Sequence, residues 1–165
     1  MATAAIALAL LVAPSGVGAA GPCWRPPTDA PVLDPYREPA CRWCPGNRGI
    51  EYDTEPGAPV RAVTSGTVTF AGSVAGVAYL VVIDPGGRRV TYGRLRDIRF
   101  ALGEVIVAGV VVGSADRSFH LGVREGDRYV DPQPLLGRFV SRPRLVPIDG
   151  GRPNPAPAPT LRCRA

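Results

Sequence analysis

The chain contains one histidine, His120, and histidine is the residue type that most often binds zinc and transfers protons at neutral pH. Zinc hydrolases usually take two or three imidazole nitrogens as ligands, and many use further histidines for proton transfer. A chain with one histidine cannot fill these roles in the usual way. Because side chains two residues apart share a face of a strand, Ser118 and His120 should point together. Phe119, Leu121 and Val123 should then face the core.

The segments around His120 predict a β domain. Glycine and proline are frequent, with 20 and 19 residues, and helix-favouring runs are rare. This composition is typical of short strands joined by turns. Strands are expected at residues 59–63, 66–72, 79–83, 89–92, 105–107, 110–113 and 118–124. The sequence DPGG at 84–87 predicts a hairpin turn, since proline presets φ and glycine accepts positive φ. The apolar run at 79–83 predicts a strand buried on both faces.

Composition divides the chain into four parts. Residues 4–13 form an apolar run of ten, too short to cross a bilayer, and small residues follow at 17–20. Residues 1–20 are therefore interpreted as a secretory signal peptide, with a short buried helix as the alternative. Residues 21–46 hold seven prolines and are expected to wrap the domain in extended form. Residues 47–137 form the β domain, and residues 138–165 form a basic tail with a polyproline-like stretch at 152–159.

The formal net charge of +5 lies in the tail. Residues 47–137 carry ten arginines against ten carboxylates, whereas residues 138–165 carry six arginines against Asp149 alone. Such a tail suits an anionic wall polymer or lipid headgroups, and a solvated tail is the alternative. No nucleic-acid partner is expected, because basic and aromatic residues are not interleaved and no recognition helix is evident. The chain has no lysine, which excludes a carrier domain of the lipoyl or biotinyl type.

Four cysteines, Cys23, Cys41, Cys44 and Cys163, lie outside the central block. In an exported protein they would be oxidised. Three pairings are open, and Cys23 with Cys163 plus Cys41 with Cys44 would fasten both ends to the domain. The spacing of Cys41 and Cys44 also fits a redox motif or half of a zinc site. The redox interpretation needs a following helix, which the sequence lacks, and free thiolates for zinc do not suit an oxidising compartment.

Four segments of the β domain, taken in order, carry a family resemblance. They lie at 47–51 (NRGIE), 56–68 (PGAPVRAVTSGTV), 103–113 (GEVIVAGVVVG) and 120–136, which begins HLGVR and ends in DPQPLL. The ordered set resembles the lysostaphin-type (LytM-like) zinc endopeptidases, which cut peptide cross-bridges in bacterial cell walls. The resemblance implies an all-β, mostly antiparallel, barrel-sandwich-like domain with a groove over one sheet, here flanked by irregular Pro-rich ends.

Active members of that family show the patterns His-x-x-x-Asp, Tyr-x-His-Leu and His-x-His. In them the first His, the Asp and the last His hold zinc, and the other two histidines bind the attacking water or stabilise the oxyanion. The ligand positions correspond here to Asn47, Glu51 and His120, and the two catalytic positions hold Arg94 and Ser118. The residues that the resemblance places along the groove are Tyr92, Arg94, Ser118 and His120.

These substitutions remove most of the zinc chemistry. Asn47 offers a neutral amide oxygen, which suits calcium better than zinc, so Asn47, Glu51 and His120 are weak metal candidates. Arg94 stays protonated and cannot act as a base, although its guanidinium can stabilise an oxyanion. Ser118 does not transfer protons near neutral pH without a base. Arg94 is expected to pair with Glu51 where zinc would otherwise lie.

The sequence therefore indicates an exported cell-envelope protein with a degenerate peptidase domain. It is expected to be non-catalytic, to need no cofactor, and to bind peptidoglycan peptides or a wall hydrolase that it regulates. The alternative is an active peptidoglycan metalloendopeptidase that binds zinc through unusual ligands. For His120 and Glu51, purely structural roles stay open, and Asp131 is expected to stabilise a turn.

Overall fold

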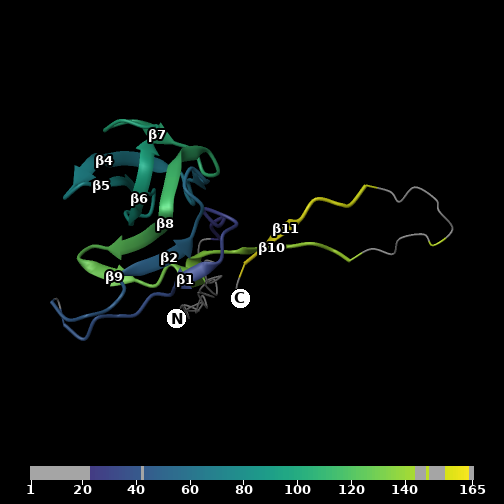
Figure 1. Ribbon diagram of the computed structural model, residues 1–165, viewed down its shortest axis with the longest axis horizontal. Helices are drawn as coiled ribbons and strands as arrows, with labels where there is room; N and C mark the ends of the chain where they lie inside the picture. The colour runs from purple at the N-terminus through teal and green to yellow at the C-terminus, as the bar shows by residue number, and fades with distance from the viewer. Residues whose placement is uncertain (1–22, 42, 144–147, 149–154, 164–165) are drawn as a thin grey trace, which may run out of the picture.

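Figure 1 shows the computed structural model, which describes residues 23–41, 43–143, 148 and 155–163. In these residues nine strands form one sheet with the order β1-β2-β8-β6-β5-β4-β7, and β3 and β9 also pair with β8. Every strand pair is antiparallel. The predicted all-β, mostly antiparallel fold is confirmed. The expected signal peptide at residues 1–20 lies outside the described residues.

Most of the strands are short, which agrees with the frequent glycines and prolines. The sheet contains β1 (Val32–Asp34), β2 (Gly49–Asp53), β3 (Pro59–Arg61), β4 (Gly66–Val74), β5 (Val77–Ile83), β6 (Arg89–Ile98), β7 (Val105–Ile106), β8 (Val111–Glu125) and β9 (Arg128–Val130). A single 3-10 turn, η1, covers Gln133–Leu135 in the described chain. A separate two-stranded ribbon pairs β10 (Arg138–Val140) with β11 (Thr160–Arg162).

Strand β8 is the element that the rest of the sheet is built on. It has 15 residues and pairs with β2, β3, β6 and β9. The sequence predicted two strands, at 110–113 and 118–124, and this division was wrong. Ser114 and Ala115, which lie between the two predicted strands, pair with Asp97 and Leu95 of β6. One continuous strand thus carries Ser118 and His120.

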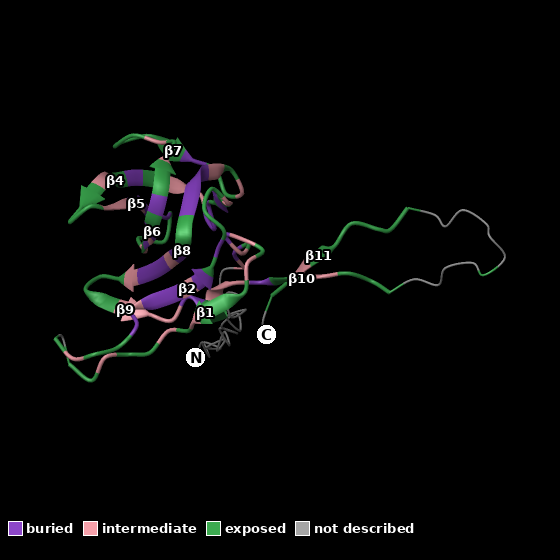
Figure 2. Cartoon of the chain, in the orientation of Figure 1, coloured by how far each residue is buried: buried purple, intermediate pink, exposed green. Residues whose placement is uncertain are grey.

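The core takes side chains from most strands of the sheet, and Figure 2 shows buried segments along β2, β6 and β8. The side chains of β8 that face it are Phe119, Leu121 and Val123, as predicted. Tyr52 of β2 and Tyr92 of β6 stack on Phe119, with ring centroids 5.8 and 6.3 Å away. Because alternate residues of a strand point to opposite faces, Glu51 lies on the face away from this core.

The hairpin predicted at residues 84–87 is present between β5 and β6. Asp84 Oδ1 accepts a hydrogen bond from the Arg88 amide at 2.8 Å, and Gly87 adopts a φ of 79°. Strand β5 differs from its prediction. Leu80 and Val82 are fully buried, but the residues that alternate with them are partly exposed. Strand β5 is therefore buried on one face only.

Both ends of the described chain are fastened to the domain. Strand β1 extends the sheet beside β2, and the backbone of Trp24 exchanges hydrogen bonds of 2.8 Å with Leu135 and Gly137. Disulfides join Cys23 to Cys163 and Cys41 to Cys44, one of the three pairings that the sequence left open.

The ribbon of β10 and β11 projects from the domain (Figure 1). Neither of its strands was predicted, because residues 138–165 were expected to form a basic tail. The polyproline-like stretch expected at 152–159 is described only from residue 155, where the chain has no regular structure until β11 begins. No helix in the described residues is long and apolar enough to cross a membrane.

Candidate functional site

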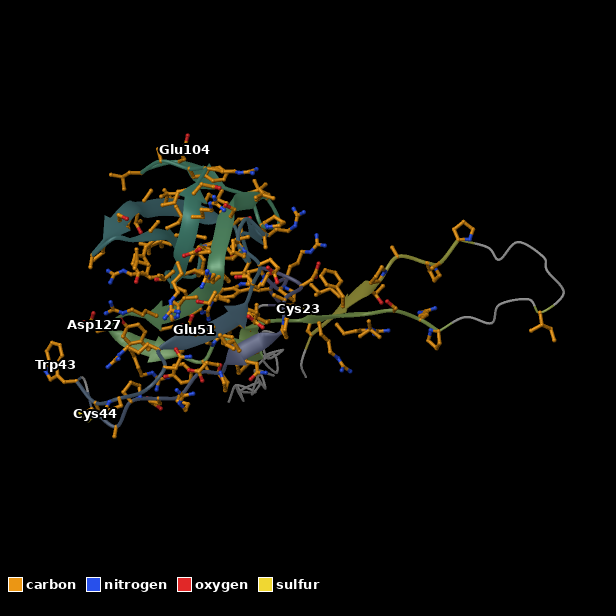
Figure 3. All side chains as sticks on the ribbon, viewed as in Figure 1. Cys23, Trp43, Cys44, Glu51, Glu104 and Asp127 are labelled. Atoms are coloured by element: carbon orange, nitrogen blue, oxygen red, sulfur yellow. A yellow bond between two sulfur atoms is a disulfide. The ribbon has the colours of Figure 1, made fainter. Side chains whose placement is uncertain are left out.

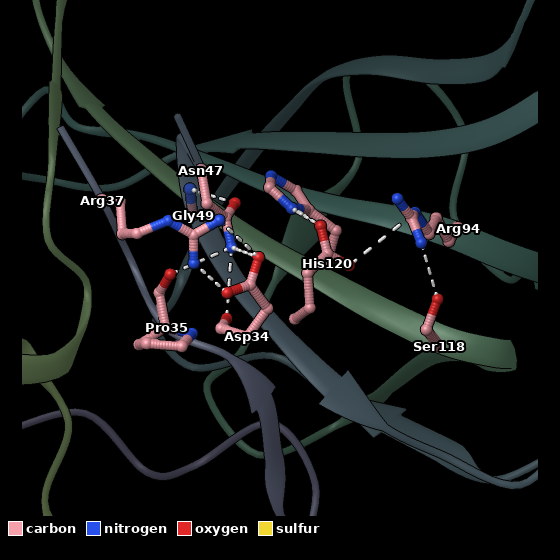
Figure 4. Close-up of polar contacts among 9 residues, drawn as sticks. Asp34, Pro35, Arg37, Asn47, Gly49, Arg94, Ser118 and His120 are labelled. Atoms are coloured by element: carbon pink, nitrogen blue, oxygen red, sulfur yellow. Dashed lines mark hydrogen bonds and ion pairs between the residues drawn. The ribbon is translucent and has the colours of Figure 1, made fainter. Parts of the chain in front are cut away.

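Glu51 and His120 meet directly across the pairing of β2 with β8. The two residues are register partners, and Nδ1 of His120 lies 2.8 Å from Oε1 of Glu51. Because an ionised carboxylate only accepts, the imidazole places its proton on Nδ1 and donates to Glu51. Both side chains are largely buried, with 19% and 13% of their surface exposed. Two of the three ligand positions inferred from the family therefore come together, bonded to each other (Figure 4).

Glycines make room for the His120 ring. A Cβ atom at Gly49 would lie 2.5 Å from Cε1 and 2.7 Å from Nε2 of the ring, and one at Gly122 would lie 3.0 Å from Nε2. Glycine is thus required at Gly49 for the ring to keep this position. The ring consequently leans toward Gly122, away from Ser118, which precedes it on β8.

Arg94 lies beside this pair in a strained backbone conformation. It is one of two described non-glycine residues with positive φ, at 57°, and it falls in an irregular stretch of the pairing between β6 and β8. Its Nε lies 3.7 Å from Oε2 of Glu51, and its Nη1 donates to Oγ of Ser118 at 2.8 Å. The ion pair expected from the sequence is present. Such strain is typical of functional sites, where the surrounding structure holds the residue in place.

Asn47 faces a different set of partners. Its amide nitrogen donates to the Asp34 and Pro35 carbonyl oxygens at 3.1 Å and to Oδ2 of Asp34 at 3.2 Å. Its amide oxygen accepts the Gly49 N–H at 3.2 Å. Arg37 also hydrogen-bonds Asp34, and this bond holds the pKa of the carboxyl below its usual value. Asn47 therefore ties β1 to the start of β2. The role of Asp34 was not predictable from the sequence, since no periodicity links it to Asn47.

Tyr92 is a core residue, and its placement along the groove was wrong. Its side chain is fully buried, and its hydroxyl accepts a hydrogen bond from the Val63 amide at 2.9 Å. Burial raises the pKa of this hydroxyl well above its ordinary value, so it stays neutral. Arg94 and Ser118 remain partly exposed beside His120. We call Glu51, Arg94, Ser118 and His120 the polar row.

The donor set at these positions does not fit a zinc ion. Catalytic zinc takes three protein ligands, from imidazole nitrogen and carboxylate oxygen. Oε2 of Glu51 is buried without a hydrogen bond, so this oxygen is available as a metal ligand. His120 bonds Glu51 through Nδ1, which leaves Nε2 as its one nitrogen for a metal. The Asn47 oxygen accepts from Gly49, and the Arg94 cation lies 3.7 Å from Oε2 of Glu51. The set therefore offers two ligand atoms instead of three, with a cation beside one of them. No group of three or more His, Cys, Asp or Glu in the described chain is placed to hold a metal ion.

The polar row does not form a serine nucleophile with its base either. Such a site needs the imidazole within about 2.6–3.2 Å of the hydroxyl. Ser118 accepts from Arg94, which cannot take up a proton, and the hydrogen-bond partner of His120 is Glu51. What the row offers is binding chemistry, namely a half-exposed guanidinium beside a hydroxyl and an imidazole.

Comparison with solved structures places the same fold in bacterial proteins. Helicobacter pylori Csd3 in its hexagonal crystal has a TM-score of 0.63 at 19% identity, over 70% of this chain and 33% of that one. The catalytic domain of the antimicrobial peptidase lysostaphin from Staphylococcus simulans has a TM-score of 0.56 at 20% identity, over 64% of this chain and 90% of that one. At these identities the likeness concerns the fold.

Two proteins of known sequence and one protein-family profile are similar to this chain. The uncharacterized protein Rv2891 of Mycobacterium tuberculosis is 33% identical over 138 residues, which take in 75% of this chain and 53% of the relative. The uncharacterized protein Rv3786c of the same organism is 34% identical over 122 residues, 66% of this chain and 30% of the relative. This chain thus spans about half or less of these relatives. The profile of peptidase family M23 matches residues 45–132, so the chain belongs to this family.

Proposed function

We propose that this chain is an exported cell-envelope protein whose M23 domain binds peptidoglycan peptides, or a wall hydrolase that it regulates, without cleaving a peptide bond. The observation that carries the proposal is the polar row. Four of the five positions that hold zinc or move protons in active members are occupied by side chains that bond to one another, and the fifth, Asn47, bonds to Asp34, Pro35 and Gly49. Glu51 is bonded to His120 and paired with Arg94, and Arg94 is bonded to Ser118.

Arg94 supplies the binding chemistry of this proposal. Its side chain is 52% exposed, and its Nη2 has no hydrogen-bond partner among the described residues. A guanidinium binds a carboxylate through paired, charge-assisted hydrogen bonds, which are about twice as strong as neutral ones. Wall peptides carry free carboxylates, so they match this group. The backbone strain at Arg94 supports a role in binding, because it places the guanidinium over the row.

Two further features support export and contact with the wall. The apolar run at residues 4–13 has the length of a signal-peptide core, and both cysteine pairs of the chain are disulfides. Disulfides persist in oxidising compartments outside the cytoplasm. The arginine-rich segment 138–165 would add affinity for an anionic wall polymer.

The first experiment asks whether the oxidised protein cleaves. Purified peptidoglycan is incubated with the protein plus zinc, and the soluble fragments are analysed by mass spectrometry, with lysostaphin as the active control. We expect no new peptide termini and no stoichiometric zinc by elemental analysis. The row lacks a third ligand for zinc, and the two catalytic positions hold Arg94 and Ser118, neither of which takes up a proton near neutral pH. Chelator-sensitive cleavage would overturn the proposal in favour of a metallopeptidase with unusual ligands.

The second experiment tests Arg94 in binding. Affinity for a wall stem peptide with a free carboxylate is measured by calorimetry for the natural sequence, Arg94→Gln and the matched control Arg99→Gln. Arg99 is exposed and lies beyond the end of β6. We expect Arg94→Gln to weaken binding about tenfold or more, the loss typical of a charge-assisted hydrogen bond, and Arg99→Gln to leave it unchanged. Equal effects of the two variants would contradict this role.

A further inference from the structure

A second concave site lies at the end of β8, away from the polar row. It is a cavity of about 860 Å³ between the segment around the Cys41–Cys44 disulfide and the turn that joins β8 to β9. Arg124 follows His120 by four residues on the same face of β8, which corresponds to about 13 Å along the strand. The residues that carry the argument are Tyr36, Trp43, Arg48, Arg124, Arg128 and Tyr129.

Three arginines line this cavity. Arg48 and Arg124 lie over the ring of Tyr129, with Cζ atoms 5.8 and 5.0 Å from its centroid, so this ring holds both cations in place. Arg128 adds a third guanidinium from the neighbouring strand. Fixed guanidiniums bind carboxylate and phosphate groups in paired hydrogen bonds. An anionic group is therefore part of the expected ligand.

Aromatic side chains also line the cavity. The Trp43 indole is 85% exposed at the tip of the disulfide loop, on the same side of the molecule as Asp127 in Figure 3. The Tyr36 ring is held by a hydrogen bond from its hydroxyl to the Tyr129 carbonyl at 3.2 Å. Rigid aromatic rings offer a large contact area at little entropic cost. A sugar ring has an apolar C–H face that packs on such surfaces.

Two carboxylates also line the cavity, and they favour a sugar ligand over a simple anion. Glu38 is exposed at the rim, and Asp127 pairs with Arg124 through Oδ1 at 3.0 Å. Carboxylates accept hydrogen bonds from hydroxyl groups, whereas they repel an anion that has no hydroxyls. They also interrupt the positive track that a nucleic acid would require.

We propose that this cavity binds an acidic saccharide, a sugar ring that carries a carboxylate or a phosphate, with Trp43 and Tyr36 against the ring and Arg48, Arg124 and Arg128 at the acid group. The volume lies within the range of sites for small organic ligands. The site is separate from the polar row, so it does not depend on whether the domain cleaves peptides.

The experiment uses the oxidised protein and five probes. These are an oligouronate, a neutral oligosaccharide of the same length, a hexose phosphate, acetate and inorganic phosphate. Binding is followed by calorimetry and by tryptophan fluorescence, in which exposed Trp43 should respond and buried Trp24 should not. We expect the acidic sugars to bind at least about tenfold more tightly than the neutral one. Added salt should weaken the binding of the acidic sugars. The oligouronate and hexose phosphate arms distinguish a carboxylate source from a phosphate source.

Variants of the lining residues test whether the sugar binds in this cavity. We expect Arg128→Gln and Trp43→Ala each to weaken binding by about tenfold, and Arg99→Gln to have no effect, since position 99 lies about 30 Å along β6 from the partner of Arg124. Circular dichroism checks that each variant is folded. The proposal is overturned if the neutral sugar binds equally well, if acetate or phosphate alone binds as tightly as the acidic sugars, if no probe binds, or if Arg99→Gln is as harmful as Arg128→Gln.

Discussion

The triple variant Asn47→His, Arg94→His, Ser118→His is expected to bind one zinc ion next to Glu51 and His120, with an affinity about 1000-fold or more above that of the natural sequence. Glu51 already has a buried carboxylate oxygen without a hydrogen bond, which a metal would satisfy. Removing Arg94 takes away the cation that lies 3.7 Å from this oxygen. Loss of a group that only orients a metal ligand lowers metal affinity by about 10–100-fold. The triple variant restores ligands themselves, so a larger gain in affinity is expected.

Histidine is also a suitable replacement for Arg94 on conformational grounds. The residue has a φ of 57°, and histidine adopts positive φ more readily than most side chains. The matched control carries Gln in place of His at the same three positions, and zinc affinity is measured by calorimetry against a competing chelator. If the folded histidine variant binds zinc no better than the control, these positions do not converge, and the family's ligand positions do not transfer to this chain.

Breaking the Cys23–Cys163 disulfide is expected to have the largest effect on stability. The bridge closes a loop with a sequence separation of 140 residues. In the chain-entropy treatment, a bridge across such a loop stabilises the folded state by about 5 kcal/mol, whereas the bridge across the short Cys41–Cys44 loop stabilises it by about 2 kcal/mol. The double variant Cys23→Ser, Cys163→Ser should therefore unfold at a temperature lower by roughly 10–20 °C, as followed by circular dichroism.

The matched comparison is the double variant Cys41→Ser, Cys44→Ser. It should lose less than half as much, because its loop spans only three residues of separation. Trp24, next to Cys23, is buried and hydrogen-bonded to the backbone around η1, so the native state keeps the two ends in place without the bridge. Equal losses in the two double variants would show that the long bridge does not restrain the unfolded chain.

Much of the fold was predictable, because the pattern of short strands and turns is local. The two-residue period of a strand predicted that Phe119, Leu121 and Val123 face the core. Proline and glycine predicted the turn at 84–87. The continuity of β8 was not predictable in this way. Polar residues such as Ser114 and Asp116 interrupt its apolar pattern, and only the pairing with β6 shows that the strand continues.

The candidate site was predictable in part. The contacts of Glu51 with Arg94 and His120 followed from the family positions. The resemblance placed Tyr92 along the groove together with Arg94, and residues two positions apart share a face on a regular strand. The irregular pairing and positive φ at Arg94 break that rule. The bonds of Asn47 to β1 join segments without a shared pattern, so they required the structure.

The covalent link between Cys23 and Cys163 encloses nearly the whole described chain, including the sheet and the projecting ribbon of β10 and β11. A protease that cuts the backbone once at any point between these cysteines leaves two pieces that stay joined through sulfur. Gel electrophoresis without reductant would show a single band after such a cut, and reductant would separate the pieces. The closure therefore lets the protein keep both pieces of a nicked backbone together.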